Sequence, residues 1–587
     1  MDPAALLAAL VIDNVLRHEL PAPPHAPTLL SEQLVTPAPP EPAVLFAPHE
    51  KLLARSEEPS RPFGELLDAY LAELTELQKA LRGATGRAAL DESAPLRRLG
   101  AGLVSADQLL QVAASVDEPA LEPVVDRFVG ATLRFAHAAR TARDFPSPAR
   151  FESPVGTVII GSRGDDRHGP AALIVDPGGD DFYERAPVTR GSVSVIVDLG
   201  GNDRYTGSDV AIRGLSALID LAGNDRYEMV TGLGAAIGGA SLLVDAEGSD
   251  RYSARYFAQG AAAFGFGALV DHAGDDRYRI AAWGQGLGLA GGIGLLWDRA
   301  GNDSYFAAGE SDVFERGAGL SGAQGAALGF RGLLGGGIGL LRDDAGDDTY
   351  VAQMFAQGSG YYYSLGFLWD GGGNDRYGAV RYAQGSGAHQ AVGVLRDEAG
   401  NDRYGLSFGV GQGMGLDLAQ GILIDLKGDD EYRGGLLVQG AATANGFGLL
   451  RDRDGANRFV IGEDRLAAGP PRSWGHAEWF GGLPSTGLLD TPRERARFSP
   501  ASGPSPPTRV DEKVDAPVMP SREALEKMEK HPSCGVRAAA LRASGSVEAA
   551  QAALRSSCWR LQAAALAALA RHGVPPAADA PLPSFLR

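Results

Sequence analysis

The amino-acid sequence predicts a mainly β protein, a parallel β-solenoid with α-helical segments before and after it. Three observations support this fold class: one aspartate-rich motif recurs along the chain, most copies lie 22–28 residues apart, and a short alternating strand precedes each copy. A period of this length is typical of solenoids, in which each repeat packs only against its neighbours. We therefore expect about 11–13 coils of 22–28 residues within residues 151–495.

The chain before the repeats is expected to form two parts. Residues 1–61 contain two Pro-rich stretches and predict an extended arm. Residues 62–150 place Leu66, Leu67, Tyr70 and Leu74 at helical spacing. We expect a small helical cap domain there, because the ends of a solenoid must be covered to prevent edge-to-edge growth.

Each repeat contains the motif Asp, two residues, Gly, Asn or Asp, Asp, any residue, Tyr. Asp176 opens the regular series, and Asp452 closes it with Asn457 in place of the second aspartate. The candidate site residues are the first and second aspartates of the copies between them: Asp198 and Asp203, Asp220 and Asp225, Asp245 and Asp250, Asp271 and Asp276, Asp298 and Asp303, Asp343 and Asp348, Asp370 and Asp375, Asp397 and Asp402, and Asp425 and Asp430.

A short strand ends at each first aspartate. In the strand 265–271, alternation places Leu269 and Asp271 on one face, and the equivalent leucines of other repeats form the predicted core column. The opposite face holds a mixed set, including Trp297, Arg342 and Trp369, that we expect to point outward. A Gln-Gly pair precedes most strands, and the 45-residue spacing between the motif tyrosines at 305 and 350 predicts an additional turn of the solenoid.

The Gly-Asn-Asp centre of the motif is typical of tight turns, because Gly reaches positive φ freely and Asn and Asp bond neighbouring amides. Carboxylates stacked one strand apart, about 4.8 Å, repel each other by about 3 kcal/mol at an effective dielectric constant near 20. Compensation from the arginines that often precede the tyrosine, such as Arg204, Arg226 and Arg251, is one hypothesis. Bound Ca²⁺ is the other, because it takes six to eight oxygen ligands.

The Gly-Asn-Asp-x-Tyr half of the motif, as in residues 201–205, resembles the hemolysin-type (RTX) calcium-binding repeat. That family forms a parallel β-roll with Ca²⁺ in its turns, so the resemblance implies that the paired aspartates are calcium ligands. The chain departs from the family in having one copy per coil rather than tandem nonapeptides. Its leading Gly-Gly is also largely replaced by Asp and a variable residue.

The chain after the repeats is expected to contain a Pro/Ser-rich linker, residues 496–520, and a helical module, residues 521–587. Two Ala- and Leu-rich segments of this module resemble HEAT repeats. Cys534 and Cys558 occupy equivalent places in these segments, either as a disulfide or as two buried thiols.

Composition limits the function classes. The formal net charge of -19 argues against nucleic acid and anionic lipid as general partners, and no apolar run is long enough to span a membrane. Only 6 of the 54 basic residues are lysine, which we interpret as the signature of a GC-rich bacterial genome. We expect secretion or attachment to the cell envelope, with a cytoplasmic location as the alternative because no signal peptide is visible.

The leading functional hypothesis is a non-enzymatic scaffold that binds a protein partner through its helical ends or through the insertion 306–323. The alternative is a carbohydrate-active β-helix enzyme or a lectin with a glycan ligand. Its sugar platforms would be Trp283, Trp297, Trp369 and the run 361–363, and its acidic groups would lie in the insertion.

Overall fold

A computed structural model describes residues 61–86, 115–307, 313–315, 318–331, 334–461, 485–492, 495–500, 546–553 and 555. The chain divides into two compact units, residues 1–506 and 507–587. In the second unit the structure describes one helix, α10 (Val547–Ala553). The predictions for the proline-rich arm, for both cysteines and for most of the HEAT-like module concern residues outside the described ranges.

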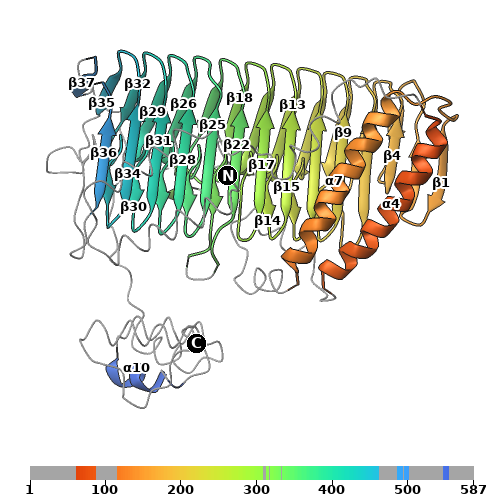
Figure 1. Ribbon diagram of the computed structural model, residues 1–587, viewed down its shortest axis with the longest axis horizontal. Helices are drawn as coiled ribbons and strands as arrows, with labels where there is room; N and C mark the ends of the chain where they lie inside the picture. The colour runs from red at the N-terminus through yellow and green to blue at the C-terminus, as the bar shows by residue number, and fades with distance from the viewer. Residues whose placement is uncertain are drawn as a thin grey trace. The chain divides into compact units, whose positions relative to one another are not determined.

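The first unit is a parallel β-solenoid, which confirms the predicted fold class (Figure 1). Each regular coil contributes one strand to each of two long sheets and a two-residue strand or bridge to a third side. The 14-stranded sheet contains β1 (Ala149–Ser153), β2 (Gly156–Ile160), β4 (Leu173–Asp176), β6 (Val193–Asp198), β9 (Leu215–Asp220), β12 (Ala240–Asp245), β15 (Phe266–Asp271), β17 (Ile293–Asp298), β22 (Ile338–Asp343), β25 (Leu365–Asp370), β28 (Val392–Asp397), β31 (Gln420–Asp425), β34 (Phe447–Asp452) and β36 (Thr486–Asp490).

The second long sheet begins just after the second aspartate of each motif. This 13-stranded sheet contains β3 (Arg167–His168), β5 (Phe182–Arg185), β7 (Arg204–Ser208), β10 (Arg226–Thr231), β13 (Arg251–Ala258), β16 (Arg277–Gly284), β18 (Ser304–Ala307), β23 (Thr349–Ala352), β26 (Arg376–Ala383), β29 (Arg403–Gly411), β32 (Glu431–Gly434), β35 (Arg458–Ile461) and β37 (Arg497–Pro500). Every adjacent pair in it is parallel and in register, so equivalent motif residues form columns.

The third side is made of short parallel pairs. Its strands are β8 (Ala211–Ile212), β11 (Ala236–Ile237), β14 (Ala262–Ala263), β21 (Ala327–Leu328), β24 (Gly360–Tyr361), β27 (Gly387–Ala388), β30 (Gly415–Leu416) and β33 (Ala442–Thr443). Single bridges through Gly288 join its two halves. Three strands per coil account for the repeat length that the sequence shows.

The predicted core column is confirmed. The residue two positions before each first aspartate, which is Ile174 or Ile196 in the first two motif coils and Leu in the others, is buried inside the solenoid and packs against the motif tyrosines. These tyrosines form one continuous stack: neighbouring rings from Tyr183 to Tyr432 lie 4.7–4.9 Å apart, nearly parallel. Aromatic stacking therefore repeats at the strand spacing along the whole interior.

The Gln-Gly pairs form the corner before the 14-stranded sheet. Gln259 has φ +54° and is completely buried, and its Nε2 donates to the carbonyls of Tyr252 and Arg279 at 3.0 and 3.1 Å. Six further glutamines share the positive φ and the bond to the motif tyrosine's carbonyl, at 285, 324, 357, 384, 412 and 439, and all of these except Gln285 also bond the next coil. The side-chain amide thus ties its own coil to the next one, which offsets the cost of a left-handed backbone at a non-glycine residue.

The long repeat contains no additional coil, so that prediction was wrong. β18 pairs directly with β23, and β17 pairs directly with β22, so both long sheets continue across it in register. The extra residues instead leave the coil as an insertion that includes the antiparallel pair β19 (Val313–Glu315) and β20 (Ala318–Gly319). Register is preserved because the buried Asp and Tyr columns specify it on both sides of the insertion.

Two helices precede the solenoid, α4 (Phe63–Ala84) and α7 (Glu118–Arg140). Asp117 caps α7 by accepting a bond from the Ala120 amide, and Tyr70 of α4 bonds Thr132 of α7 at 2.8 Å. Neither described helix is long and apolar enough to cross a membrane.

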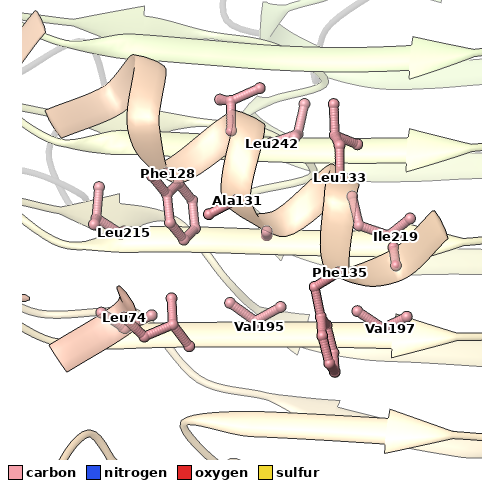
Figure 2. Close-up of a cluster of buried hydrophobic side chains, with 14 of the residues drawn as sticks. Leu74, Phe128, Ala131, Leu133, Phe135, Val195, Val197, Leu215, Ile219 and Leu242 are labelled. Atoms are coloured by element: carbon pink, nitrogen blue, oxygen red, sulfur yellow. The ribbon is translucent and has the colours of Figure 1, made fainter. Parts of the chain in front are cut away.

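These helices lie on the outer face of the 14-stranded sheet (Figure 2). Phe128 and Phe135 of α7 pack over Val195, Leu215 and Ile219, whose side chains point away from the solenoid interior. These strands are apolar on both faces and therefore require a cover. The helical segment is confirmed, but it covers a side of the solenoid, whereas the first coil is covered by the antiparallel pairing of β1 with β2.

Candidate metal centre in the aspartate columns

The first and second aspartates of the motif form two inward-facing columns. The first aspartate is the last residue of each strand of the 14-stranded sheet, and the second lies just before each strand of the 13-stranded sheet. All eighteen predicted site residues are at most 2% exposed. The inward direction of the first aspartates confirms the parity argument. The second aspartates form a buried column beside them, which that argument did not address.

Among the predicted first aspartates, all but Asp245 accept hydrogen bonds on both carboxylate oxygens, whereas Oδ1 of Asp245 is buried without a partner among the described residues. Oδ2 of Asp271 accepts from the hydroxyl of Tyr252 in the preceding coil at 2.6 Å, and Oδ1 accepts from the Ala273 amide at 3.0 Å. Tyr278 repeats the hydroxyl contact to Asp298 at 2.6 Å. This hydroxyl contact was not predicted from the sequence. The signal that could have suggested it is the recurrence of one Tyr and one Asp in every coil, since their spacing varies from 15 to 38 residues.

Each second aspartate is only half satisfied. Oδ1 of Asp276 accepts from the backbone amide of Asp250 in the preceding coil at 2.5 Å, and Asp303 accepts from Asp276 in the same way at 2.6 Å. The other oxygen, Oδ2, is buried without a hydrogen-bond partner within the described chain. This holds for Asp181, Asp203, Asp225, Asp250, Asp276, Asp303, Asp348, Asp375, Asp402 and Asp430.

The two columns meet in groups of three carboxylates. The first and second aspartates of one coil and the first aspartate of the next each offer an oxygen, and these oxygens lie within 4.8 Å of one another. One such group is Asp220, Asp225 and Asp245, all of them buried. An unpartnered buried oxygen in each group is the feature that a cation or a proton would satisfy.

The arginines that precede the tyrosines do not compensate these carboxylates, so the counter-charge hypothesis was wrong. Arg204, Arg226 and Arg251 alternate with the buried tyrosines along their strands and are exposed on the outer face. The period of two along a strand puts neighbouring residues on opposite faces, so these guanidinium groups point away from the aspartates.

Burial and mutual repulsion disfavour ionisation of the columns. Burial raises the pKa of Asp203 to about 9, with a further contribution from the Asp198 carboxylate, and it raises that of Asp303 to about 10. Burial, with the neighbouring carboxylates of Asp225 and Asp198, raises the pKa of Asp220 well above its usual range. Without a cation the columns must therefore hold protons near neutral pH.

Both ends of the columns are closed by a different side chain. At the N-terminal end, His168 takes the place of a tyrosine and its Nε2 lies 2.7 Å from Oδ2 of Asp176. At the C-terminal end, Asn457 takes the place of a second aspartate. Its Nδ2 donates to Oδ1 of Asp452 and to the carbonyl of Asp454, and its Oδ1 keeps the bond to the Asp430 amide. At the second position the terminal coil thus has an amide donor where the other coils have an unpartnered oxygen, although Oδ2 of Asp452 is itself buried without a partner among the described residues.

The residues present fit calcium in their chemistry. Each complete motif adds two carboxylates, a charge that one Ca²⁺ balances, and the buried oxygens are hard ligands of the kind that calcium prefers. The first and second aspartates, together with the first aspartate of the next coil, would hold the ion. Bound calcium would neutralise the columns and cross-link neighbouring coils.

The predicted sugar platforms are largely used for packing. Trp297 and Trp369 are 4% and 9% exposed, and the Arg342 guanidinium lies over both rings at 4.7 and 4.4 Å. Tyr361 packs edge-on against Phe355 and His389, whereas Tyr363 is half exposed. Glu310 and Asp312 of the insertion fall outside the described residues.

The comparisons with known proteins add no family. No family model matches the chain, and neither the curated proteins nor the solved structures yield a match. The resemblances to RTX and HEAT repeats therefore rest on the motif residues alone.

Replacing Tyr278 with Phe is expected to lower the free energy of unfolding by about 1–3 kcal/mol, because Asp298 loses a donor while the ring stack is kept. Phe459 already occupies this column, so the aromatic ring alone is tolerated sterically. Chemical denaturation measures the change. The half-exposed Tyr363, replaced with Phe, is the control and should leave the stability unchanged; an equal loss in both variants would contradict the assigned bond.

Proposed function

We propose that the protein is a non-enzymatic, calcium-stabilised scaffold. The observation that supports this most directly is the uniformity of the coils: each complete motif uses its aspartates and its tyrosine in the same way. Catalysis by paired acids needs groups in unequal environments, one as acid and one as base. The described coils instead repeat one environment, which is typical of a structural role.

Rigidity follows from three interlocking columns. The tyrosine stack and the backbone-to-aspartate bonds join each motif coil to the next, and buried glutamines add such links from Gln259 onward. Calcium in the aspartate columns would add a fourth connection between neighbouring coils. This connection would depend on the calcium concentration around the protein. Extracellular modules bind calcium at about 10⁻⁴–10⁻³ M, so we propose a secreted or envelope-attached location. The second compact unit and the insertion are the proposed contacts for a protein partner.

A thermal melt with and without chelator tests the calcium proposal. Calcium that binds only the folded state raises its stability by mass action, about 2.7 kcal/mol for one site at a hundredfold excess over Kd. We expect a large rise in melting temperature with Ca²⁺ and a smaller one with Mg²⁺, which prefers fewer ligands at shorter distances. Direct measurement of bound metal should give several ions per chain. No shift at millimolar Ca²⁺ would reject calcium binding and leave the scaffold without its proposed stabiliser.

A further inference from the structure

The outer face of the 13-stranded sheet contains a column of arginines. The residue before each motif tyrosine is in register with its counterpart in the next strand, for example Arg226 with Arg204 and with Arg251. The column reads Arg167, Phe182, Arg204, Arg226, Arg251, Arg277, Ser304, Thr349, Arg376, Arg403, Glu431, Arg458 and Arg497. Nine of these thirteen positions are arginine in a protein whose net charge is -19.

Three consecutive arginines of this column make no ion pair within the described chain, and the exposed Glu228 on the same face of β10 is bonded to Arg204. Arg226, Arg251 and Arg277 are exposed, and none of them makes an ion pair with another described residue. Arg204, by contrast, bonds Glu228 at 2.6 Å. The nearest turn carboxylate in sequence, Asp275, accepts from the backbone and side chain of Asn302 instead. Like charges directly opposite each other on neighbouring strands destabilise a sheet. The stability of the fold therefore does not explain why these arginines are adjacent.

Further cationic and apolar groups lie beside the row. Arg279 is exposed two residues beyond Arg277, with its guanidinium 5.2 Å from the ring of Phe306. Phe306 and Val230 are two of the few large apolar side chains exposed on the described surface, at 37% and 54%. The face formed by β10, β13 and β16 therefore combines a straight line of guanidinium groups with apolar contacts at its edges.

We propose that the outward face of β10, β13 and β16 binds a linear acidic polysaccharide, with Arg226, Arg251 and Arg277 contacting carboxylates of successive sugar residues. The arginines recur at the strand spacing, roughly 4.8 Å, which is close to the length of one pyranose residue in an extended chain. Guanidinium groups bind carboxylates in a bidentate fork, and apolar side chains such as Phe306 suit the faces of sugar rings. The polymer runs along the solenoid, perpendicular to the strands.

Charge complementarity favours this ligand over nucleic acid. The row is one residue wide and lies within an acidic protein, whereas nucleic-acid affinity depends on broad clusters of Lys and Arg. A linear polymer with one carboxylate per sugar residue needs only one row of arginines. This binding role goes beyond the scaffold function, since it assigns a ligand to a surface that the aspartate columns do not use.

Binding of a short linear oligogalacturonide, measured by calorimetry at a fixed low calcium concentration, tests the proposal. The triple variant R226T/R251T/R277T places Thr where the column already contains Thr349, and it is expected to lose roughly tenfold or more in affinity. R226K/R251K/R277K should retain part of the affinity, because Lys keeps the charge and lacks the fork. Affinity of the wild type should fall as salt rises.

The matched control is R127S/R134S/R150S, which removes three exposed charges from α7 and β1 and should bind like the wild type. The fully methyl-esterified oligogalacturonide, which has the same backbone without charge, should not bind. Thermal melts should show the triple Thr variant at least as stable as the wild type, since it relieves repulsion within the row. Wild-type affinity in the triple Thr variant, equal binding of the methyl ester, or stronger binding of single-stranded DNA would each overturn the proposal.

Discussion

Replacing Asp276, Asp303 and Asp348 with Asn is expected to stabilise the metal-free protein and to reduce its response to calcium. Each substitution keeps the Oδ1 acceptor that the preceding coil uses and adds an amide donor, as Asn457 does in the terminal coil. Removing an unsatisfied buried carboxylate is expected to gain about 1–3 kcal/mol at each position without metal. The same change removes a calcium ligand, so the calcium-induced shift should shrink.

The control for this experiment lies in the adjacent turn position. Asp275, Asp347 and Asp429 are exposed and also accept bonds from the next coil, and Asn occupies the same place at Asn302 and Asn374. The triple D275N/D347N/D429N has the same charge change and should alter neither the metal-free stability nor the number of bound ions. Chelator melts and metal analysis on both triples separate the outcomes. A buried triple that binds as much calcium as the wild type would remove these carboxylates from the proposed site.

The metal-free protein is expected to lose stability as pH rises from about 5 to 9, by several kcal/mol in total over the columns. Burial raises the folded-state pKa of Asp198 to about 7, of Asp276 to about 8 and of Asp303 to about 10, whereas aspartate in the unfolded chain titrates near 3.9. Between these values the folded state holds protons that the unfolded state has released. The stabilisation is thus complete below the unfolded pKa and is lost as pH rises through the folded values.

Calcium should counteract this loss of stability as pH rises. Metal ions compete with protons for the same carboxylates, so the calcium-induced rise in melting temperature should grow from pH 5 to pH 9. Melts in calcium and in metal-free buffer at three pH values measure both slopes. A metal-free stability that increases over this range would mean that the aspartates are ionised in the folded state without calcium, contrary to the proposed electrostatics.

Most of the solenoid was predictable because its information is periodic. The recurring Asp, Gly, Asp and Tyr positions set the repeat length, and the parity of Leu269 with Asp271 identified the inward face. The same logic predicted that the first aspartates would form an inward-facing column. Register followed from sequence because shifting a strand by one residue would expose the leucines and bury the arginines.

Contacts between coils were harder to predict from the sequence. The bond from the Tyr252 hydroxyl to Asp271 and the bond from the Asp250 amide to Asp276 join residues that are 19 and 26 positions apart. The insertion after Tyr305 was misread as a coil because spacing alone does not distinguish residues within a sheet from residues that leave it.

The sequence by itself therefore determined the fold class, the repeat, the core column and the inward direction of the first aspartates, since each depends on local periodicity. Only the tertiary structure decided that the tyrosine hydroxyls bond the first aspartates of the next coil, and that α4 and α7 cover a side of the solenoid. Those facts depend on which groups meet across coils and layers, which a one-dimensional pattern does not record. Because the two charges lie on opposite faces, the aspartates are uncompensated inside, and Arg226, Arg251 and Arg277 make no ion pair with a described residue outside. Both proposed ligands follow from this separation.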